Sequence, residues 1–131
     1  MFKIFTFYNL FSAFSAFIVW GGWSYYINYQ ADPSMGLISG LAQGSSSFLV
    51  TFITVVAIAK IYYSLTSKFS KILLPAVIIV AILTIFMTII HILVGTPQIL
   101  YTITPSLSMT FVFCIATAYK LSLDDNKLVK S

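Results

Sequence analysis

The chain has 131 residues, of which 60% are hydrophobic and 8% are charged. Soluble domains carry about 25% charged residues, and a chain of this length could not bury so much apolar surface in one soluble core. The composition therefore excludes an ordinary soluble domain and favours a protein embedded in a lipid bilayer. The formal charge of +4 comes from lysines at the ends of apolar runs, without a basic stripe, so we expect no nucleic-acid partner.

Four apolar segments are long enough to cross the hydrocarbon layer, which is roughly 30 Å thick, as helices. They cover about residues 4–27, 37–65, 72–94 and 99–123. Apolar and polar residues do not alternate in them as they do in strands of membrane barrels, and the connectors are short. The sequence predicts an all-α, polytopic membrane protein, a single domain built as an antiparallel four-helix transmembrane bundle. Residues 124–131 are expected to form a short polar cytoplasmic tail.

The distribution of lysines predicts the orientation, because positive charge favours the cytoplasmic side of a membrane. Lysines precede the first span, surround the connector between the second and third spans, and follow the fourth. They are Lys3, Lys60, Lys68, Lys71, Lys120, Lys127 and Lys130. We therefore predict a multi-pass protein of the cell inner (plasma) membrane with both termini in the cytoplasm. Aromatic residues of the first span would then form an interfacial belt on the outer side, namely Trp20, Trp23, Tyr25 and Tyr26.

The second span carries small residues on one face. Gly36, Gly40 and Gly44 recur at every fourth position, and Ser47 continues the same face. Small residues at this spacing allow helix backbones to approach closely in lipid. The pattern predicts a helix-packing face, used either against another span of the same chain or against another subunit.

Polar residues concentrate in the outer halves of the second, third and fourth spans. Because polar groups at membrane depth need partners or water, they predict either an outward-facing polar pocket or a set of interhelical hydrogen bonds without a cavity. The candidate residues are Asn28, Gln43, Ser46, Thr88, His91, Gln98 and Thr104. Pro105 lies inside the fourth span and is expected to kink that helix, which frees a backbone carbonyl.

The sequence offers little for catalysis. It contains no paired carboxylates within a span, no Ser/His/Asp set and no phosphate-binding glycine loop. His91 is the only histidine and has no nearby carboxylate in the sequence, which disfavours a metal site. We therefore expect no enzymatic activity, no catalytic residues, no metal and no cofactor.

Two functional classes remain. The first is an accessory or assembly subunit of a larger inner-membrane complex, acting through helix–helix contacts. The alternative is a small oligomeric transporter or channel, for a lipid or a small neutral solute, that uses the outward-facing polar pocket. The first is favoured slightly, because no carboxylate for proton coupling lies within a span. The expected partners are membrane lipids and other membrane-protein subunits, in a homo- or hetero-oligomer.

Overall fold

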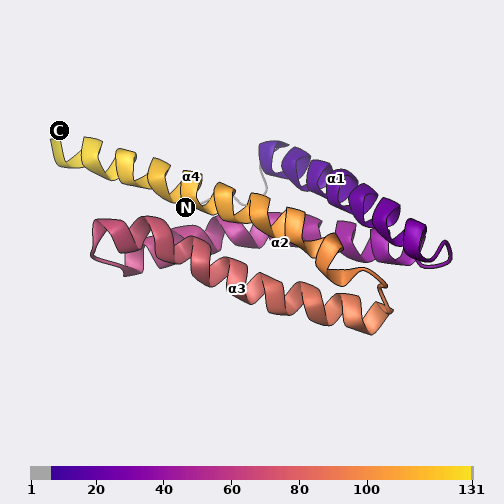
Figure 1. Ribbon diagram of the computed structural model, residues 1–131. Coiled ribbons are helices and arrows are strands. Elements are labelled where there is room, and N and C mark those ends of the chain that lie inside the picture. Colours follow the sequence, from indigo (N-terminus) through magenta and orange to yellow (C-terminus); the bar gives the residue numbers. More distant parts are fainter. Residues whose placement is uncertain (1–6, 131) are drawn as a thin grey trace.

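The computed structural model describes residues 7–130 and shows an all-helical fold. Its four helices are α1 (Phe7–Ala31), α2 (Gly36–Ser64), α3 (Lys68–Val94) and α4 (Ile99–Lys130). Consecutive helices run in opposite directions, and short connectors join them at the two ends of the bundle (Figure 1). The predicted all-α class is confirmed.

Three of the helices, α2, α3 and α4, are long and apolar enough to cross a membrane. In α4 the qualifying stretch is Ile99–Lys127. Over the described residues α1 is not among the three, because serines, asparagines, glycines and tyrosines interrupt its apolar sequence. The first predicted span begins at Ile4, and residues 4–6 lie outside the described part of the chain, as does Lys3.

α4 is longer than the predicted fourth span. It remains helical as far as Lys130, through most of the segment expected to be a polar tail. Two contacts stabilise this extension: Lys127 pairs with Asp124 at 3.7 Å, and Asp125 contacts α2 and α3. Asp125 therefore ties the end of α4 to the bundle, whereas the Lys127–Asp124 pair lies within α4 itself.

α1 and α2 cross where glycines bring backbone against backbone. A Cβ atom added to Gly40 would lie 3.0 Å from the carbonyl oxygen of Gly21, and one added to Gly44 would lie 3.0 Å from that of Phe17. A Cβ atom on Gly36 would lie 2.9 Å from the Cβ of Tyr29. Close packing of this kind is what holds helices together in lipid. The glycine face of α2 is therefore occupied by α1 of the same chain.

α2 and α4 each contact all three other helices, whereas α1 and α3 do not meet within the described residues. The second half of α2 packs with α3 and α4 in an apolar cluster. This cluster contains Ile58, Tyr62, Ala76, Ile79, Cys114 and Ala118. The interior is thus apolar at the end of the bundle that holds the α2–α3 connector, residues 65–67.

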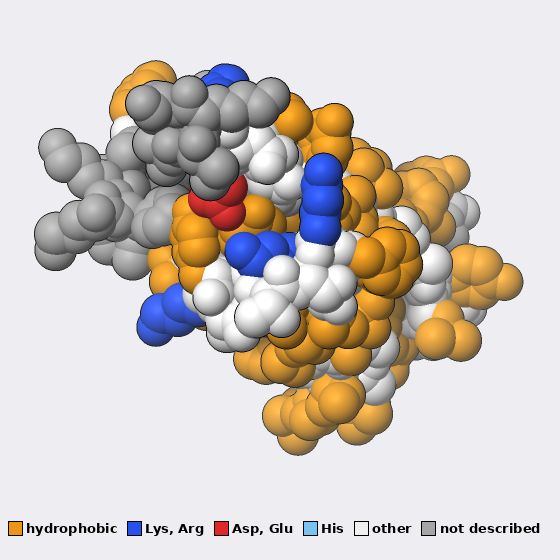
Figure 2. Space-filling model, turned by 90° about the vertical axis from the view of Figure 1, so that its left-hand side faces the viewer, with side chains coloured by type: hydrophobic (Ala, Val, Ile, Leu, Met, Phe, Trp, Pro, Cys, Tyr) orange, Lys and Arg blue, Asp and Glu red, His pale blue; other side chains and the backbone are white. Residues whose placement is uncertain are grey.

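We call this end the lysine end, because the last turns of α2, the first turns of α3 and the last part of α4 all place lysines there. Figure 2 looks onto it and shows lysine and acidic side chains on this face with hydrophobic side chains around them. The lysines with described side chains are Lys60, Lys68, Lys71, Lys120 and Lys127. Elsewhere most of the large exposed side chains are Ile, Leu, Val and Phe, as expected for contact with lipid.

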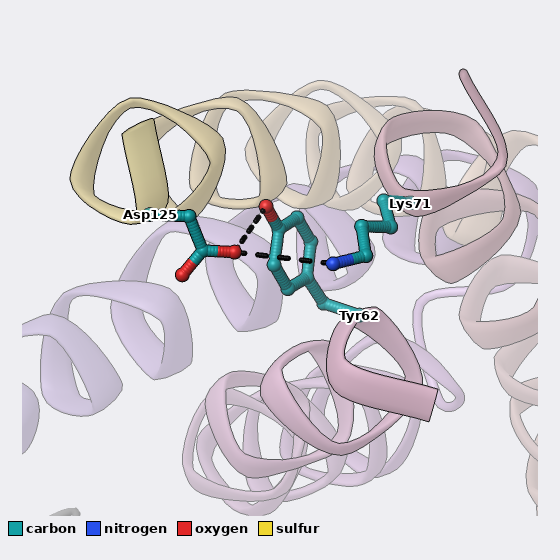
Figure 3. Close-up of polar contacts among 3 residues, drawn as sticks. All are labelled: Tyr62, Lys71 and Asp125. Atoms are coloured by element: carbon teal, nitrogen blue, oxygen red, sulfur yellow. Dashed lines mark hydrogen bonds and ion pairs between the residues drawn. The ribbon is translucent and has the colours of Figure 1, made fainter. Parts of the chain in front are cut away.

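Three residues join α2, α3 and α4 at the lysine end (Figure 3). The Tyr62 hydroxyl donates to Asp125 Oδ2 at 3.0 Å, and Lys71 Nζ lies 3.9 Å from the same oxygen. The Lys71 ammonium also lies 4.9 Å from the centre of the Tyr62 ring, within cation–π range. Lys71 is therefore already engaged by protein groups.

Candidate functional site

A connected set of buried polar side chains lies at the opposite end of the bundle, where the connectors at residues 32–35 and 95–98 are found. We call this the network end. The set draws on all four helices, and every member is 6% exposed or less except Gln98, which takes part through its backbone N–H. This polar network consists of Ser24, Asn28, Ser39, Gln43, Ser47, His91, Thr96, Gln98, Thr102 and Ser106.

His91 lies at the centre of the polar network. Gly95 ends α3 in the left-handed conformation, with a φ of 76°, and the chain then turns back so that the Thr96 N–H donates to the His91 carbonyl oxygen at 2.9 Å. Thr96 Oγ1 lies 2.7 Å from His91 Nδ1, and Gln43 Oε1 lies 2.7 Å from Nε2. Because an amide oxygen only accepts, Nε2 carries a hydrogen. Both ring nitrogens are thus bonded.

Further hydrogen bonds extend from both sides of the His91 ring. The Gln43 side-chain Nε2 donates to Ser106 Oγ on α4 at 3.0 Å, and Ser39 Oγ donates to Thr96 Oγ1 at 3.2 Å. The Thr96 oxygen therefore accepts from Ser39 and keeps its own hydrogen for His91 Nδ1. All donors point the same way along the chain of bonds from Ser39 to Ser106, an arrangement in which each bond strengthens the next.

Asn28 joins α1 to the beginning of α4. Its Nδ2 donates to the Ser24 carbonyl oxygen and to Thr102 Oγ1, both at 2.8 Å. Its Oδ1 accepts from the backbone N–H of Gln98 at 3.0 Å. Ser24 Oγ in turn donates to the carbonyl oxygen of Ser39 at 2.9 Å. Asn28 therefore connects α1 to the same network that holds His91.

Four predicted pocket residues are brought together and three are not. The four that join the polar network are Asn28, Gln43, His91 and Gln98. They are held by interhelical hydrogen bonds, which is the second of the two arrangements that the sequence predicts. The other three do not join it. Ser46 Oγ donates to the Ala42 carbonyl oxygen of its own helix, Thr104 is exposed and donates to the Leu100 carbonyl oxygen, and Thr88 is half-buried on α3. Among the side chains that the structure describes, no buried nitrogen or oxygen lacks a hydrogen-bond partner.

The candidate list from the sequence omitted several members of the network. Ser24 lies four residues before Asn28, and Thr102 lies four residues before Ser106. Residues four apart share a helix face, so this spacing was the available signal. Thr96 lies in a connector, where no helical periodicity applies, and only the turn at Gly95 places its hydroxyl under His91.

Pro105 and Trp23 form a second contact between α1 and α4. Proline has no N–H, so Pro105 cannot donate to the carbonyl oxygen of Tyr101, four residues earlier in α4. The indole Nε1 of Trp23 donates to that oxygen at 2.9 Å. α4 continues as a helix through Pro105. The freed carbonyl that the sequence predicts is therefore bound by a tryptophan of another helix.

Replacing Trp23 with phenylalanine is expected to destabilise the bundle by about 1 kcal/mol through the lost hydrogen bond. The effect should shrink when Pro105 is also replaced by alanine, because the new backbone N–H can donate to the Tyr101 oxygen. The four variants of this cycle would be compared by unfolding in a dodecyl sulfate titration. Equal losses from Trp23→Phe in both backgrounds would contradict the assigned contact.

The other aromatic residues of the predicted belt differ in exposure. Tyr25 and Tyr26 are exposed on the last turns of α1, and Tyr25 stacks on Tyr29 with ring centres 5.6 Å apart. Trp20 is half-buried and faces the space between α1 and α4. Tyr25 and Tyr26 thus have the exposure that an interfacial belt requires, whereas Trp20 lies beside a cavity.

That cavity, which we call the lateral groove, has a volume of about 470 Å³. α1 and α4 touch at the network end and flank the groove beyond it, while α2 and α3 form its floor. It reaches from the level of Ser47 and Ser106, at the edge of the polar network, toward the lysine end. Residues that line it include Ser12, Ser15, Ala16, Trp20, Ser47, Val50, Thr51, Thr54, Met87, Ser106, Thr110 and Phe113. The structure thus places a cavity beside the polar network and at the depth of the apolar spans.

The lateral groove presents no charged side chain, and several of its hydroxyl groups donate to their own helices. Ser15, Thr51 and Thr110 donate to the carbonyl oxygens four residues earlier, at 2.9, 2.8 and 2.8 Å respectively. The surface that these three side chains present to the groove therefore consists mainly of methyl or methylene groups and oxygen lone pairs. Such a surface suits an apolar chain far better than a charged solute.

The polar network and the lateral groove are the two candidate sites of this structure. The buried side chains of the network are all hydrogen-bonded to protein groups, whereas the groove has volume but no reactive group. Within residues 7–130, no three His, Cys, Asp or Glu side chains come together as metal ligands would. No family model, no curated protein and no solved structure matches this chain.

Proposed function

We propose that all four helices cross the membrane and that the lysine end faces the cytoplasm. α1 has 25 residues, about 37 Å of helix at 1.5 Å per residue, and it contains no charged residue. It packs along α2 through the glycine crossing, which supports its lying at the same depth. The lysines at one end and Asp32 in a connector at the other support the orientation.

Topology mapping tests this proposal. A cysteine at Ser34, placed in a Cys114→Ala background, should react with a membrane-impermeant maleimide from the outside. An epitope tag at the N-terminus and a cysteine at Ser67 should both be protected. If the N-terminal tag and the Ser34→Cys thiol were both accessible from outside, α1 would not span the membrane.

We further propose that the chain is a non-enzymatic lipid-binding protein of the inner membrane, which takes an acyl chain into the lateral groove. The observation that carries this proposal is the groove itself. Its volume of about 470 Å³ lies within the range of roughly 300–1,000 Å³ typical of ligand sites. It is flanked by two spans, so a lipid could enter sideways from the bilayer. The hydroxyls of Ser15, Thr51 and Thr110, which donate to their own helices, and the lack of charge fit an acyl chain.

A photoactivatable acyl-chain phospholipid tests whether the groove is occupied. Reconstituted protein is irradiated and the crosslinked residues are mapped by mass spectrometry. We expect crosslinks to Ser15, Thr51 and Thr110 in excess of those to Ile85 and Ile89, which are exposed on α3 away from the groove. Equal labelling of both surfaces would reduce the groove to part of the general lipid contact and would overturn the proposal.

A second function, the accessory or assembly subunit, is favoured by a different surface. Thr84 of α3 and Thr104 and Ser108 of α4 are exposed beside a shallow groove between the two helices. Hydroxyl residues on a lipid-facing surface are common where another transmembrane helix packs.

Native mass spectrometry from mild detergent distinguishes the two functions. A stable complex that the double substitution Thr84→Leu/Ser108→Leu dissociates supports assembly. A monomer with bound lipid, unaffected by that change, supports lipid binding.

A further inference from the structure

The lateral groove and Lys120 lie on the same side of α4. Lys120 follows Phe113 by seven residues and Ser106 by fourteen, and both of those residues line the groove. Seven and fourteen residues are close to two and four helical turns. Lys120 therefore continues the groove face toward the lysine end, roughly 10 Å beyond Phe113 at 1.5 Å per residue.

Lys120 is the lysine on this face that protein carboxylates leave unpaired. Its side chain is exposed, and it forms no ion pair among the described residues, whereas Lys71 is engaged by Asp125 and Lys127 by Asp124. A lysine at the end of a span extends its ammonium group to the level of the lipid head groups. Lys120 is thus placed where a lipid in the groove would have its phosphate.

We propose that the groove and Lys120 form one site for an anionic phospholipid of the leaflet at the lysine end. An acyl chain occupies the groove, and the ammonium group of Lys120 pairs with the negatively charged head group. This inference rests on the proposed lipid-binding function and adds the head-group class and the leaflet. The charge of the site selects the lipid: a zwitterionic head group gains less from a single unpaired lysine than an anionic one does.

Lys60 offers a matched control at the same end of the bundle. It is exposed, belongs to α2 and also lacks an ion pair in the described part of the chain. It lies thirteen residues after Ser47, which places it on a different face of α2 from the groove residues. Lys60→Gln therefore removes the same charge without touching the proposed site.

The full chain, purified with equal amounts of dioleoylphosphatidylglycerol and dioleoylphosphatidylcholine, is tested by native mass spectrometry. We expect phosphatidylglycerol to be retained preferentially. Lys120→Gln should lower that preference about fivefold, the factor for one lysine near a charged lipid surface, while Lys60→Gln leaves it unchanged. Equal effects of the two substitutions, or none, would overturn the assignment of Lys120.

Groove-filling variants separate this inference from the proposed function. Thr110→Phe and Ser15→Phe, on the two walls, should abolish retention of both lipids, whereas Val112→Phe on the exposed side of α4 should not. If the two fillings leave retention intact, lipid binding in the groove fails altogether. If they abolish it but Lys120→Gln changes nothing, the groove function stands and the head-group assignment fails. A homodimer that retains no lipid would overturn both.

Discussion

Replacing Gly40 with leucine is expected to break the contact between α1 and α2 and to destabilise the bundle by roughly 3 kcal/mol, the upper end for overpacking. The first added atom would lie 3.0 Å from the Gly21 carbonyl oxygen and 3.0 Å from the Tyr25 Cβ. Backbone atoms cannot rotate away, so the two helices would have to separate. In lipid there is no hydrophobic effect to hold them together after that separation.

Gly22 provides the control for this substitution. It is exposed on α1, and nothing lies within 4 Å of a Cβ atom added there. Gly22→Leu should therefore leave stability unchanged or raise it by about 0.5–1 kcal/mol, because glycine is a poor residue for a helix interior. In a dodecyl sulfate titration the unfolding midpoint of Gly40→Leu should fall, whereas that of Gly22→Leu should stay or rise. Equal midpoints would mean that α1 does not pack on this face.

The helices were largely predictable because the membrane constrains them so strongly. An apolar run long enough to span lipid must be helical, since a helix satisfies its own backbone. The ends were less predictable. α4 passes its apolar region and continues to Lys130, and the contacts of Asp125 with Tyr62 and Lys71 that hold this extension arise only in the folded arrangement.

The use of the polar residues was predictable only in part. Periodicity indicates which residues share a helix face, and so it pointed to Gln43 and His91, but it does not identify the partner across an interface. The bond from Gln43 to His91 depends on the rotation of α2 relative to α3. The role of Thr96 depends on the left-handed turn at Gly95, a local conformation that leaves no periodic signal.

The lateral groove was not predictable from any single segment. Its walls come from α1 and α4, and its floor comes mainly from α2, with residues of ordinary composition for a membrane helix. It exists because α1 is tied to α4 at the network end, through Trp23 and Asn28. The same contacts that seal one end of the interior therefore define the cavity beside it.

Removing the Gln43 side-chain amide should be among the most damaging single changes in this protein. Gln43→Leu leaves the His91 Nε2–H without an acceptor, in a fully buried position, and an orphaned buried donor costs about 1–3 kcal/mol. His91→Leu in turn orphans the Gln43 oxygen. The double variant should lose less stability than the sum of the two, by about 0.5–3 kcal/mol, because neither partner remains unpaired across the bond. Strict additivity would contradict the contact.

Two further measurements show whether such losses belong to the polar network. Thr84→Val on α3 removes an exposed hydroxyl that bonds only to the Val80 carbonyl oxygen of its own helix, so its effect should be near zero. Because His91 is the only histidine, its imidazole ¹⁵N resonances can be assigned directly. They should report the tautomer with hydrogen on Nε2, and Gln43→Leu should shift the Nε2 resonance more than the Nδ1 resonance. Hydrogen on Nδ1 alone would reverse the direction of donation along the bonds from Ser39 to Ser106. It would contradict the assignment of the Gln43 side-chain oxygen as the acceptor of the His91 Nε2–H.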